Sequence, residues 1–352
     1  MGSFKRFFLG LPFLIRSSGL RFPSSIQIEE EILPSKLVPD KQYRFKYYFP
    51  KNRSKEKNPT IFLTHGMSGY GIDDLRMFDA AISLSSCGYT VVVPEFKEIK
   101  ALKITPESVR NIKDVFLVLL DQKNINTTDI GFFSISFSAG YGLVALTDPE
   151  IASKVKSVIA IGGFANLLDT CSFAIGNYLV DDYPGNILFY NYLHLLYKDS
   201  EELANTFYEA ALDNGFNRRG NDQIAPKLYE TLSDKHKEIF DRVKIDESFR
   251  KDLVGKIKEA YGEPANSISP IFYIHKMKSP VCLVHGKNDN VIPENESLTL
   301  ASRMKEAGLD FYLEITGLLS HGDKVPFWNQ LGSLPSLSTA FGYFFEKLTE
   351  RK

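Results

Sequence analysis

Short apolar runs alternate with amphipathic segments through the first half of the chain. Four of these runs are mainly apolar and have the length of a buried strand, at residues 60–63, 89–93, 130–133 and 155–161. Segments with helical periodicity lie between them, at residues 73–86, 105–120 and 139–146. A strand followed by a helix, repeated in this way, predicts an α/β protein with a mostly parallel, doubly wound sheet and helices on both faces.

The alternation then stops for more than a hundred residues. Residues 164–276 contain aromatic, helix-like segments but no convincing buried strand, and a stretch of this length is too long to be a loop inside a compact domain. We therefore expect a helical cap inserted into the core. Apolar runs at 281–284 and 310–315 resume the sheet, and the amphipathic residues 337–348 predict a closing helix. The predicted organisation is an N-terminal segment at 1–40, the first part of the core at 41–163, the cap at 164–276 and the second part of the core at 277–352.

In the N-terminal segment, Lys5 and Arg6 precede the apolar residues 7–15, which are too few to span a bilayer. We expect a terminal helix that packs on the domain or on a partner, and residues 4–15 are a candidate for peripheral membrane contact. Residues 21–40 are rich in glutamate and contain proline, which predicts a connector. The folded core should then start near Lys41, with an edge strand at residues 43–49.

Composition and charge narrow the possible functions. The chain has 352 residues, a hydrophobic content of 43% that is ordinary for a soluble globular protein, and a formal charge of −1, which gives no electrostatic footprint for nucleic acid. Cys87, Cys171 and Cys282 are far apart, so neither a disulfide framework nor a metal site is indicated and a reducing, cytoplasmic location is expected. No metal, nucleotide or flavin motif occurs in the sequence, and we expect no cofactor.

The sequence TDIGFFSISFSAGYG, at residues 128–142, predicts a strand, a sharp turn and a helix. Ser134, Ser136 and Ser138 occupy the frame of a glycine-x-serine-x-glycine nucleophile elbow, with serine where glycine is usual. If Ser136 is the nucleophile, Ser134 and Ser138 are its small flanks; if Ser138 is, the flanks are Ser136 and Gly140. We favour Ser136, because it needs only a four-residue apolar strand. A serine-rich turn without chemistry is the alternative interpretation.

Other polar signals also follow predicted strands. His65-Gly66 ends the first core strand, the segment HGKNDNVIP holds Asp289 after a later strand, and His321 lies in the loop after the last strand. The carboxyl ends of parallel strands meet at one edge of the sheet, which is where ligands bind in open α/β sheets. We therefore expect these residues to lie near the elbow.

In their order along the chain, from about Tyr43 to the C-terminus, these signals resemble the α/β-hydrolase fold, in which the serine, acid and histidine follow in that sequence. More narrowly, the stretches GYGIDDLRMF, PEFKEIKALKITPESV and SISFSAG followed by IGGFANL are similar to those of a poorly characterised bacterial branch with a large cap. The resemblance implies a serine hydrolase of the esterase type.

The resemblance also implies a Ser-His-Asp triad. Ser136 would be the nucleophile, His321 the general base that later protonates the leaving group, and Asp289 the residue that orients the imidazole. The backbone N–H groups of Phe137 and Met67 would form the oxyanion hole.

Two of these assignments have alternatives. Ser138 is the alternative nucleophile, and Asp169 is the alternative acid, because some enzymes of this fold place the acid one strand earlier. Asp289 could instead be a turn aspartate, and a histidine before glycine, such as His65 or His285, more often orders a loop than acts as a base.

Two functions therefore compete. The first is a serine hydrolase that cleaves a small-molecule carboxylic ester. The Phe and Tyr residues of the cap are candidates for lining an apolar acyl pocket, although aromatic residues at helical spacing more often form the cap's own core. The second is a non-catalytic α/β-hydrolase-fold module that binds a lipid or protein partner.

Overall fold

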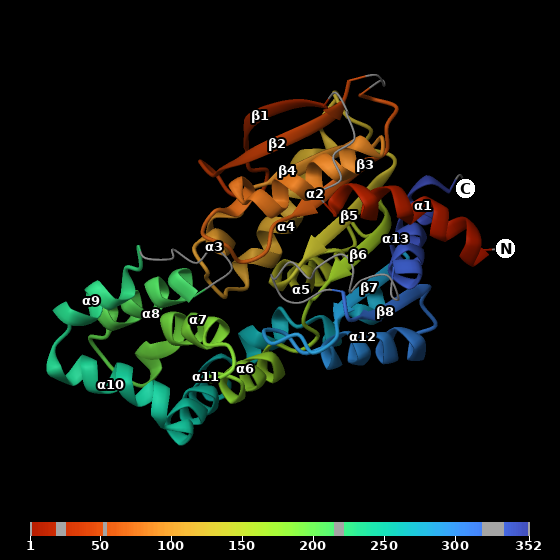
Figure 1. The fold of residues 1–352 in the computed structure, drawn as a ribbon. Coiled ribbons are helices and arrows are strands. Elements are labelled where there is room, and N and C mark those ends of the chain that lie inside the picture. Colours follow the sequence, from red (N-terminus) through yellow and green to blue (C-terminus); the bar gives the residue numbers. More distant parts are fainter. Residues whose placement is uncertain (1, 19–25, 52–54, 215–221, 319–333, 351–352) are drawn as a thin grey trace.

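An eight-stranded sheet forms the centre of the computed structural model, which describes residues 2–18, 26–51, 55–214, 222–318 and 334–350 (Figure 1). The strand order is β1-β2-β4-β3-β5-β6-β7-β8. The strands are β1 (Ile26–Pro34), β2 (Gln42–Pro50), β3 (Thr60–Thr64), β4 (Thr90–Pro94), β5 (Ile130–Ile135), β6 (Val155–Ile161), β7 (Val281–Gly286) and β8 (Phe311–Thr316).

The sheet is mostly parallel, as the alternation of strands and helices predicted. Strands β3 to β8 pair in parallel, whereas β1 pairs antiparallel with β2 and β2 antiparallel with β4. The six runs of the sequence correspond to β3 to β8. The inner strands β3 to β7 are apolar because both of their faces are covered, whereas β8 is an edge strand whose residues are mostly half-buried. The carboxyl ends of these strands share one edge, and the connections that leave that edge carry the predicted chemistry.

Helices cover both faces of the sheet (Figure 1). On one face, α1 (Gly2–Ser17), α2 (Leu75–Ser86) and α13 (Leu334–Thr349) share a core with residues such as Ile61 and Leu63. On the other face, α4 (Glu107–Leu120), α5 (Phe137–Ala145) and α12 (Asn295–Glu306) share a second core that includes Phe62, which lies between those two residues in β3. Successive side chains of a strand point to opposite faces, so one apolar run supplies both cores.

The N-terminal helix packs against the C-terminal helix, as predicted for a terminal helix on the domain. The two backbones approach closely at two glycines: a Cβ on Gly10 would lie 1.9 Å from the carbonyl oxygen of Ser338, and one on Gly342 would lie 1.7 Å from that of Arg6. Arg6 Nε also donates a 2.7 Å hydrogen bond to Glu346. None of the described helices is both long and apolar enough to cross a membrane, and membrane contact through residues 4–15 stays a prediction.

The prediction of a connector before Lys41 is wrong for Ile26–Pro34, which forms β1. This strand pairs with β2 along its whole length, so β2 lies inside the sheet and β1 is the edge strand. Glu30 and Glu31 are solvent-exposed and Glu29 is half-buried, and a charged, largely exposed edge strand lacks the apolar pattern by which the inner strands were recognised.

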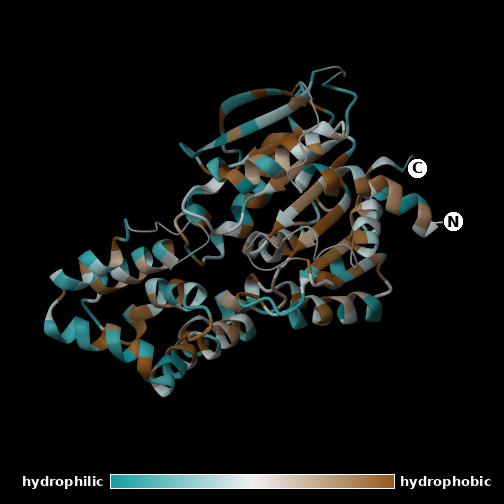
Figure 2. Cartoon of the chain, viewed as in Figure 1, coloured by the Kyte–Doolittle hydropathy of each residue, from teal (hydrophilic) through white to brown (hydrophobic). Residues whose placement is uncertain are grey.

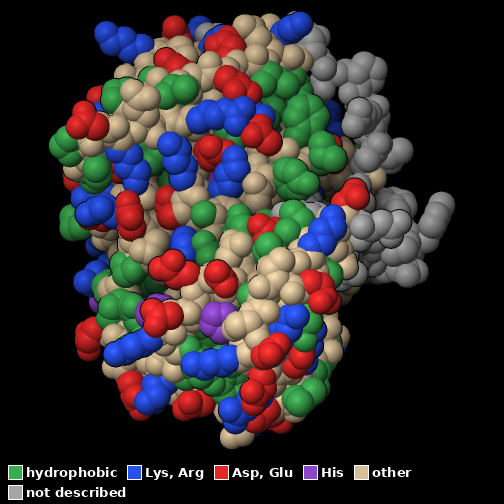
Figure 3. All heavy atoms as spheres, turned by 90° about the vertical axis from the view of Figure 1, so that its left-hand side faces the viewer, with side chains coloured by type: hydrophobic (Ala, Val, Ile, Leu, Met, Phe, Trp, Pro, Cys, Tyr) green, Lys and Arg blue, Asp and Glu red, His purple; other side chains and the backbone are tan. Residues whose placement is uncertain are grey.

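A helical insertion separates β6 from β7: every secondary-structure element that the structure describes between these two strands is a helix (Figure 1). Its main helices extend away from the sheet, and hydrophilic residues occupy much of α9 and α10 (Figures 1 and 2). On the face shown in Figure 3, acidic and basic side chains are interspersed rather than gathered by sign. The main helices are α6 (Leu167–Gly176), α7 (Tyr183–Tyr192), α8 (Glu201–Asn214), α9 (Ala225–Thr231), α10 (Asp234–Ile245) and α11 (Glu247–Ser267).

Candidate active site

Ser136 has the backbone conformation of a nucleophile elbow. It lies between β5 and α5 with φ 58° and ψ −138°, and its N–H donates a 2.7 Å hydrogen bond to the carbonyl of Ile161 on β6. Positive φ in a residue that carries a side chain costs about 1–3 kcal/mol and persists where the surrounding structure enforces it. This strained turn between a central strand and a helix is the position at which the fold presents its nucleophile.

The flanking serines have different surroundings. Ser138 is buried in the first turn of α5, and its Oγ donates a 2.5 Å hydrogen bond to the carbonyl oxygen of His65. Ser134 is buried in β5 with its Oγ 2.5 Å from Thr64 Oγ1 on β3. The two serines that replace the usual glycines therefore hydrogen-bond to β3 and to the loop after it. Ser136 lines the pocket and Ser138 does not, so the geometry favours Ser136 as the candidate nucleophile.

The loop after β3 lies directly against Ser136. A Cβ on Gly66 would come within 3.1 Å of Ser136 Cβ and 3.7 Å of Ser136 Oγ, so a larger side chain would crowd the nucleophile. Met67 is the next residue, and it lines the same pocket as Ser136 and Phe137. The two residues predicted to supply oxyanion-hole N–H groups are thus beside the predicted nucleophile.

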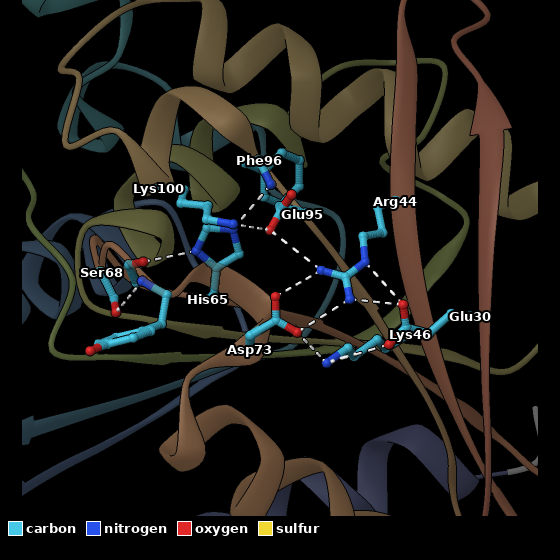
Figure 4. A network of polar contacts seen from close by, with 11 residues as sticks. Glu30, Arg44, Lys46, His65, Ser68, Asp73, Glu95, Phe96 and Lys100 are labelled. Atoms are coloured by element: carbon cyan, nitrogen blue, oxygen red, sulfur yellow. Dashed lines mark hydrogen bonds and ion pairs between the residues drawn. The ribbon is translucent and has the colours of Figure 1, made fainter. Parts of the chain in front are cut away.

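His65 fixes this loop through both of its ring nitrogens (Figure 4). The N–H of Phe96 donates to His65 Nε2 at 3.0 Å, so Nε2 is unprotonated and Nδ1, which is 2.9 Å from the carbonyl oxygen of Gly66, carries the proton. Burial lowers the pKa of this imidazole and keeps it neutral. Because C=O and N–H point in opposite directions in a trans peptide, holding the Gly66 carbonyl also orients the N–H of Met67. His65 thus orders the loop and does not face Ser136 as a base.

Charged side chains surround the turn that contributes the Phe96 N–H (Figure 4). Lys100 Nζ donates to Glu95 Oε2 at 2.8 Å, and Arg44 on β2 lies 4.0 Å from the same oxygen. Arg44 also donates to Asp73 at 2.7 Å and to Glu30 on β1 at 2.8 Å. These pairs are partly exposed, so each contributes at most about 1 kcal/mol, but together they connect the edge of the sheet to the turn that holds His65.

Asp289 is buried just beyond the carboxyl end of β7. Its Oδ1 accepts hydrogen bonds from the N–H groups of Val291 and Ile292, at 2.8 and 3.0 Å. The neighbouring His285 has one ring nitrogen 2.7 Å from Ser297 Oγ and the other 2.8 Å from the carbonyl oxygen of Ile292, so both nitrogens are engaged. Such a carboxylate, fixed by its own loop, has the geometry of a triad acid and equally that of a turn aspartate.

Asp169, the alternative acid, is exposed in the first turn of α6 and does not line the pocket. A buried carboxylate nearby was not predicted from the sequence. Glu296, on α12, accepts hydrogen bonds from the N–H groups of Ala165 and Asn166 at 2.7 and 2.8 Å, and burial raises its pKa. It holds the loop that leads into α6, and thereby one wall of the pocket that contains Thr170.

A pocket opens over Ser136. It holds about 400 Å³ of empty space, part of it open to solvent, and none of the described residues that line it carries a charged side chain. The helical insertion supplies more than half of the lining. The residues are Met67, Ile104, Ser136, Phe137, Thr170, Cys171, Ala174, Tyr183, Pro184, Ile187, Leu188 and Val291. Among the residues that the structure describes, no group of three or more His, Cys, Asp or Glu side chains is placed to hold a metal ion.

His321, the predicted base, lies outside the described residues, which end at 318 and resume at 334. Strand β8 pairs with β7 and ends at Thr316, so the chain enters that segment at the edge of the sheet where Asp289 lies. The sequence assignment of His321 therefore stays a prediction.

The backbone is similar to solved structures of much larger peptidases and of an esterase. Dipeptidyl peptidase 4 from Porphyromonas gingivalis has a TM-score of 0.55 at 11% identity, covering 90% of this chain and 35% of that one. An acylaminoacyl peptidase from Pyrococcus horikoshii has a TM-score of 0.52 at 16% identity, covering 95% and 43%. The chain thus spans less than half the length of either peptidase.

A bacterial brefeldin A esterase, described as a homologue of human hormone sensitive lipase, is similar over most of both chains. Its TM-score is 0.55 at 14% identity, covering 97% of this chain and 87% of that one. A family model described as BD-FAE matches residues 230–304, and no curated protein sequence matches the chain significantly. With its strand order, its strained serine turn and these structural similarities, the chain is an α/β-hydrolase-fold protein.

Proposed function

We propose that this protein is a serine hydrolase that cleaves a carboxylic ester through an acyl-enzyme on Ser136. The observation that carries the proposal is the position of Ser136, which combines a strained elbow conformation with a place in the wall of an apolar pocket. The fold shared with peptidases and an esterase supports hydrolysis as the class of reaction.

In the proposed reaction, Ser136 Oγ bonds to the ester carbonyl carbon while His321 accepts the hydroxyl proton. The carbonyl oxygen becomes an oxyanion that the N–H groups of Met67 and Phe137 stabilise. Collapse of this intermediate breaks the bond to the alcohol, which leaves with the proton from His321. Water then attacks the acyl-serine with His321 as base again, which releases the carboxylic acid and restores Ser136.

The described histidines of the core support His321 as the base. His65 and His285 are buried, and each has both ring nitrogens in hydrogen bonds to neighbouring groups. Asp289 is the proposed orienting acid, because it is buried at the carboxyl edge of the strand that pairs with β8.

An uncharged acyl group suits this pocket better than the free amino terminus of a peptide. A buried ammonium would need a carboxylate partner, and those lining residues that belong to the described part of the chain contribute only hydroxyl, thiol, backbone and apolar groups. We therefore propose an ester with an apolar acyl chain as the substrate, with the helical insertion acting as the cap that surrounds this chain.

The test uses p-nitrophenyl esters from acetyl to octanoyl with the wild-type protein and with Ser136→Ala. The expected result is turnover by the wild type and a loss of kcat by a factor of about 10⁴ or more in the variant, with an unchanged melting temperature. Turnover retained by folded Ser136→Ala contradicts the proposal. Folded wild-type protein that hydrolyses none of the esters favours the non-catalytic binding module instead.

A further inference from the structure

A tyrosine of the helical insertion holds the loop that carries the predicted oxyanion hole. Tyr183 is the first residue of α7, and its hydroxyl donates a 2.9 Å hydrogen bond to the carbonyl oxygen of Met67, 116 residues away in the sequence. A carbonyl oxygen can only accept, so the phenol must be the donor and must be neutral. Burial raises the pKa of this phenol further above its ordinary value, so it is protonated near neutral pH.

The bond completes a pair of restraints on Met67. The peptide on its amino side is held from the core, where His65 Nδ1 donates to the Gly66 carbonyl at 2.9 Å. The peptide on its carboxyl side is held from the insertion by Tyr183. With both neighbouring peptide planes fixed, the φ and ψ angles of Met67 are fixed as well, and so is the direction of its N–H. A donor of this kind stabilises the oxyanion most when it needs no reorganisation during the reaction.

The same helix forms one wall of the pocket. Pro184, Ile187 and Leu188 line the pocket together with the ring of Tyr183, while Met67 and Ser136 line it from the core. Any displacement of α7 from the core would therefore open the pocket and release the Met67 carbonyl at once.

On these observations we propose that Tyr183 is a positioning residue through which the helical insertion completes the oxyanion hole. This inference rests on the proposed function, since it assigns a role within the same reaction. It follows that α7 must be packed correctly against the core for rapid catalysis as well as for substrate binding. Tyr183 acts through Met67 and takes no part in bond making.

The test compares Tyr183→Phe with Tyr178→Phe. Each substitution removes one hydroxyl and keeps the ring. The control residue Tyr178 is buried in the insertion, but its hydroxyl donates to Asn186 Oδ1 at 2.8 Å, within the insertion, and it does not line the pocket. The measurements are the melting temperature, and kcat and KM for p-nitrophenyl acetate per active site titrated with a fluorophosphonate.

For Tyr183→Phe we expect kcat to fall about tenfold, less than for outright loss of an oxyanion-hole donor, with KM changed less than about twofold. Tyr178→Phe should keep the wild-type kcat even if its melting temperature falls. Equal kcat values for the wild type and Tyr183→Phe would overturn the inference, as would an equal loss of kcat in Tyr178→Phe. If the wild-type protein neither reacts with the fluorophosphonate at Ser136 nor turns over the ester, it is the proposed function that fails, and the two failures are thereby distinguished.

Discussion

The hydroxyl of Ser138 donates a 2.5 Å hydrogen bond to the backbone carbonyl of His65. This contact joins the first turn of the elbow helix to the loop that lies against Ser136. Ser136 and Ser138, only two residues apart, therefore have different roles. The hydroxyl of Ser138 is buried and donates to a carbonyl, so it is not presented to a substrate.

We therefore expect Ser138→Ala to affect stability more than chemistry. The variant loses the hydrogen bond and leaves the His65 carbonyl without this donor, so the free energy of unfolding should fall by about 1–3 kcal/mol while Ser136 stays reactive. Urea unfolding and ester hydrolysis check the two effects. If Ser138→Ala abolished turnover while Ser136→Ala retained it, the nucleophile would have to be reassigned to Ser138.

Neutral His65 predicts a pH dependence of stability. Its pKa is lowered by burial from 6.5, so below pH 6.5 the unfolded chain binds a proton that the native protein does not. The contribution of neutral His65 to the free energy of unfolding is therefore fully present above pH 6.5. It is lost as the pH falls below 6.5, by up to about 1.4 kcal/mol per pH unit.

The measurement is urea unfolding at several pH values for the wild type, His65→Gln and the exposed control His275→Gln. The wild type and His275→Gln should share the steeper loss of stability on acidification, and His65→Gln should lose less per pH unit. The same slope in all three proteins would show that His65 is not the group responsible.

The pocket predicts a selectivity for acyl-chain length that a substitution in its wall should change. Ala174 lines it from α6, so Ala174→Leu should fill space that an acyl chain would occupy. Each methylene that is no longer buried costs about 0.8 kcal/mol, so kcat/KM for octanoyl esters should fall by about tenfold or more. The acetyl ester is the internal control and should be hydrolysed at nearly the wild-type rate. An unchanged ratio between the two esters would place the acyl chain elsewhere.

The close contact between α1 and α13 predicts that a single added methyl group will lower the stability of the protein. In Gly342→Ala the new Cβ would lie 1.7 Å from the carbonyl oxygen of Arg6, so the helices must separate. We expect a loss of about 1–3 kcal/mol in the free energy of unfolding and faster tryptic cleavage within α1. The matched control is Gly255→Ala on α11, where nothing lies within 4 Å of the added Cβ and helix propensity should raise stability slightly. Equal behaviour of the two variants would contradict this close packing.

The inner strands and the elbow were predictable because their signals are local. A strand buried on both faces must be apolar throughout, and a sharp turn into a helix requires small residues, so β3 to β7 and the turn at Ser136 could be recognised from the sequence. The edge strand β1 could not be recognised in this way, because exposure allows it to carry Glu29, Glu30 and Glu31.

Contacts over long sequence separations were not predictable. Tyr183 and Glu296 each hold a loop of the site by binding its backbone, and a backbone group leaves no trace in the sequence of that loop. His65 was recognised as part of an HG turn, but its tautomer follows only from its position relative to Phe96 and Gly66.

The most direct test of the central claim is labelling of the folded protein with a fluorophosphonate, which reacts with activated serines, followed by fragmentation mass spectrometry. Trypsin releases Ser134, Ser136 and Ser138 on one peptide, Asn124 to Lys154, so fragment ions must locate the adduct. The account predicts an adduct on Ser136 that is absent from His321→Ala. An adduct on Ser138, or none on folded wild-type protein, would contradict it.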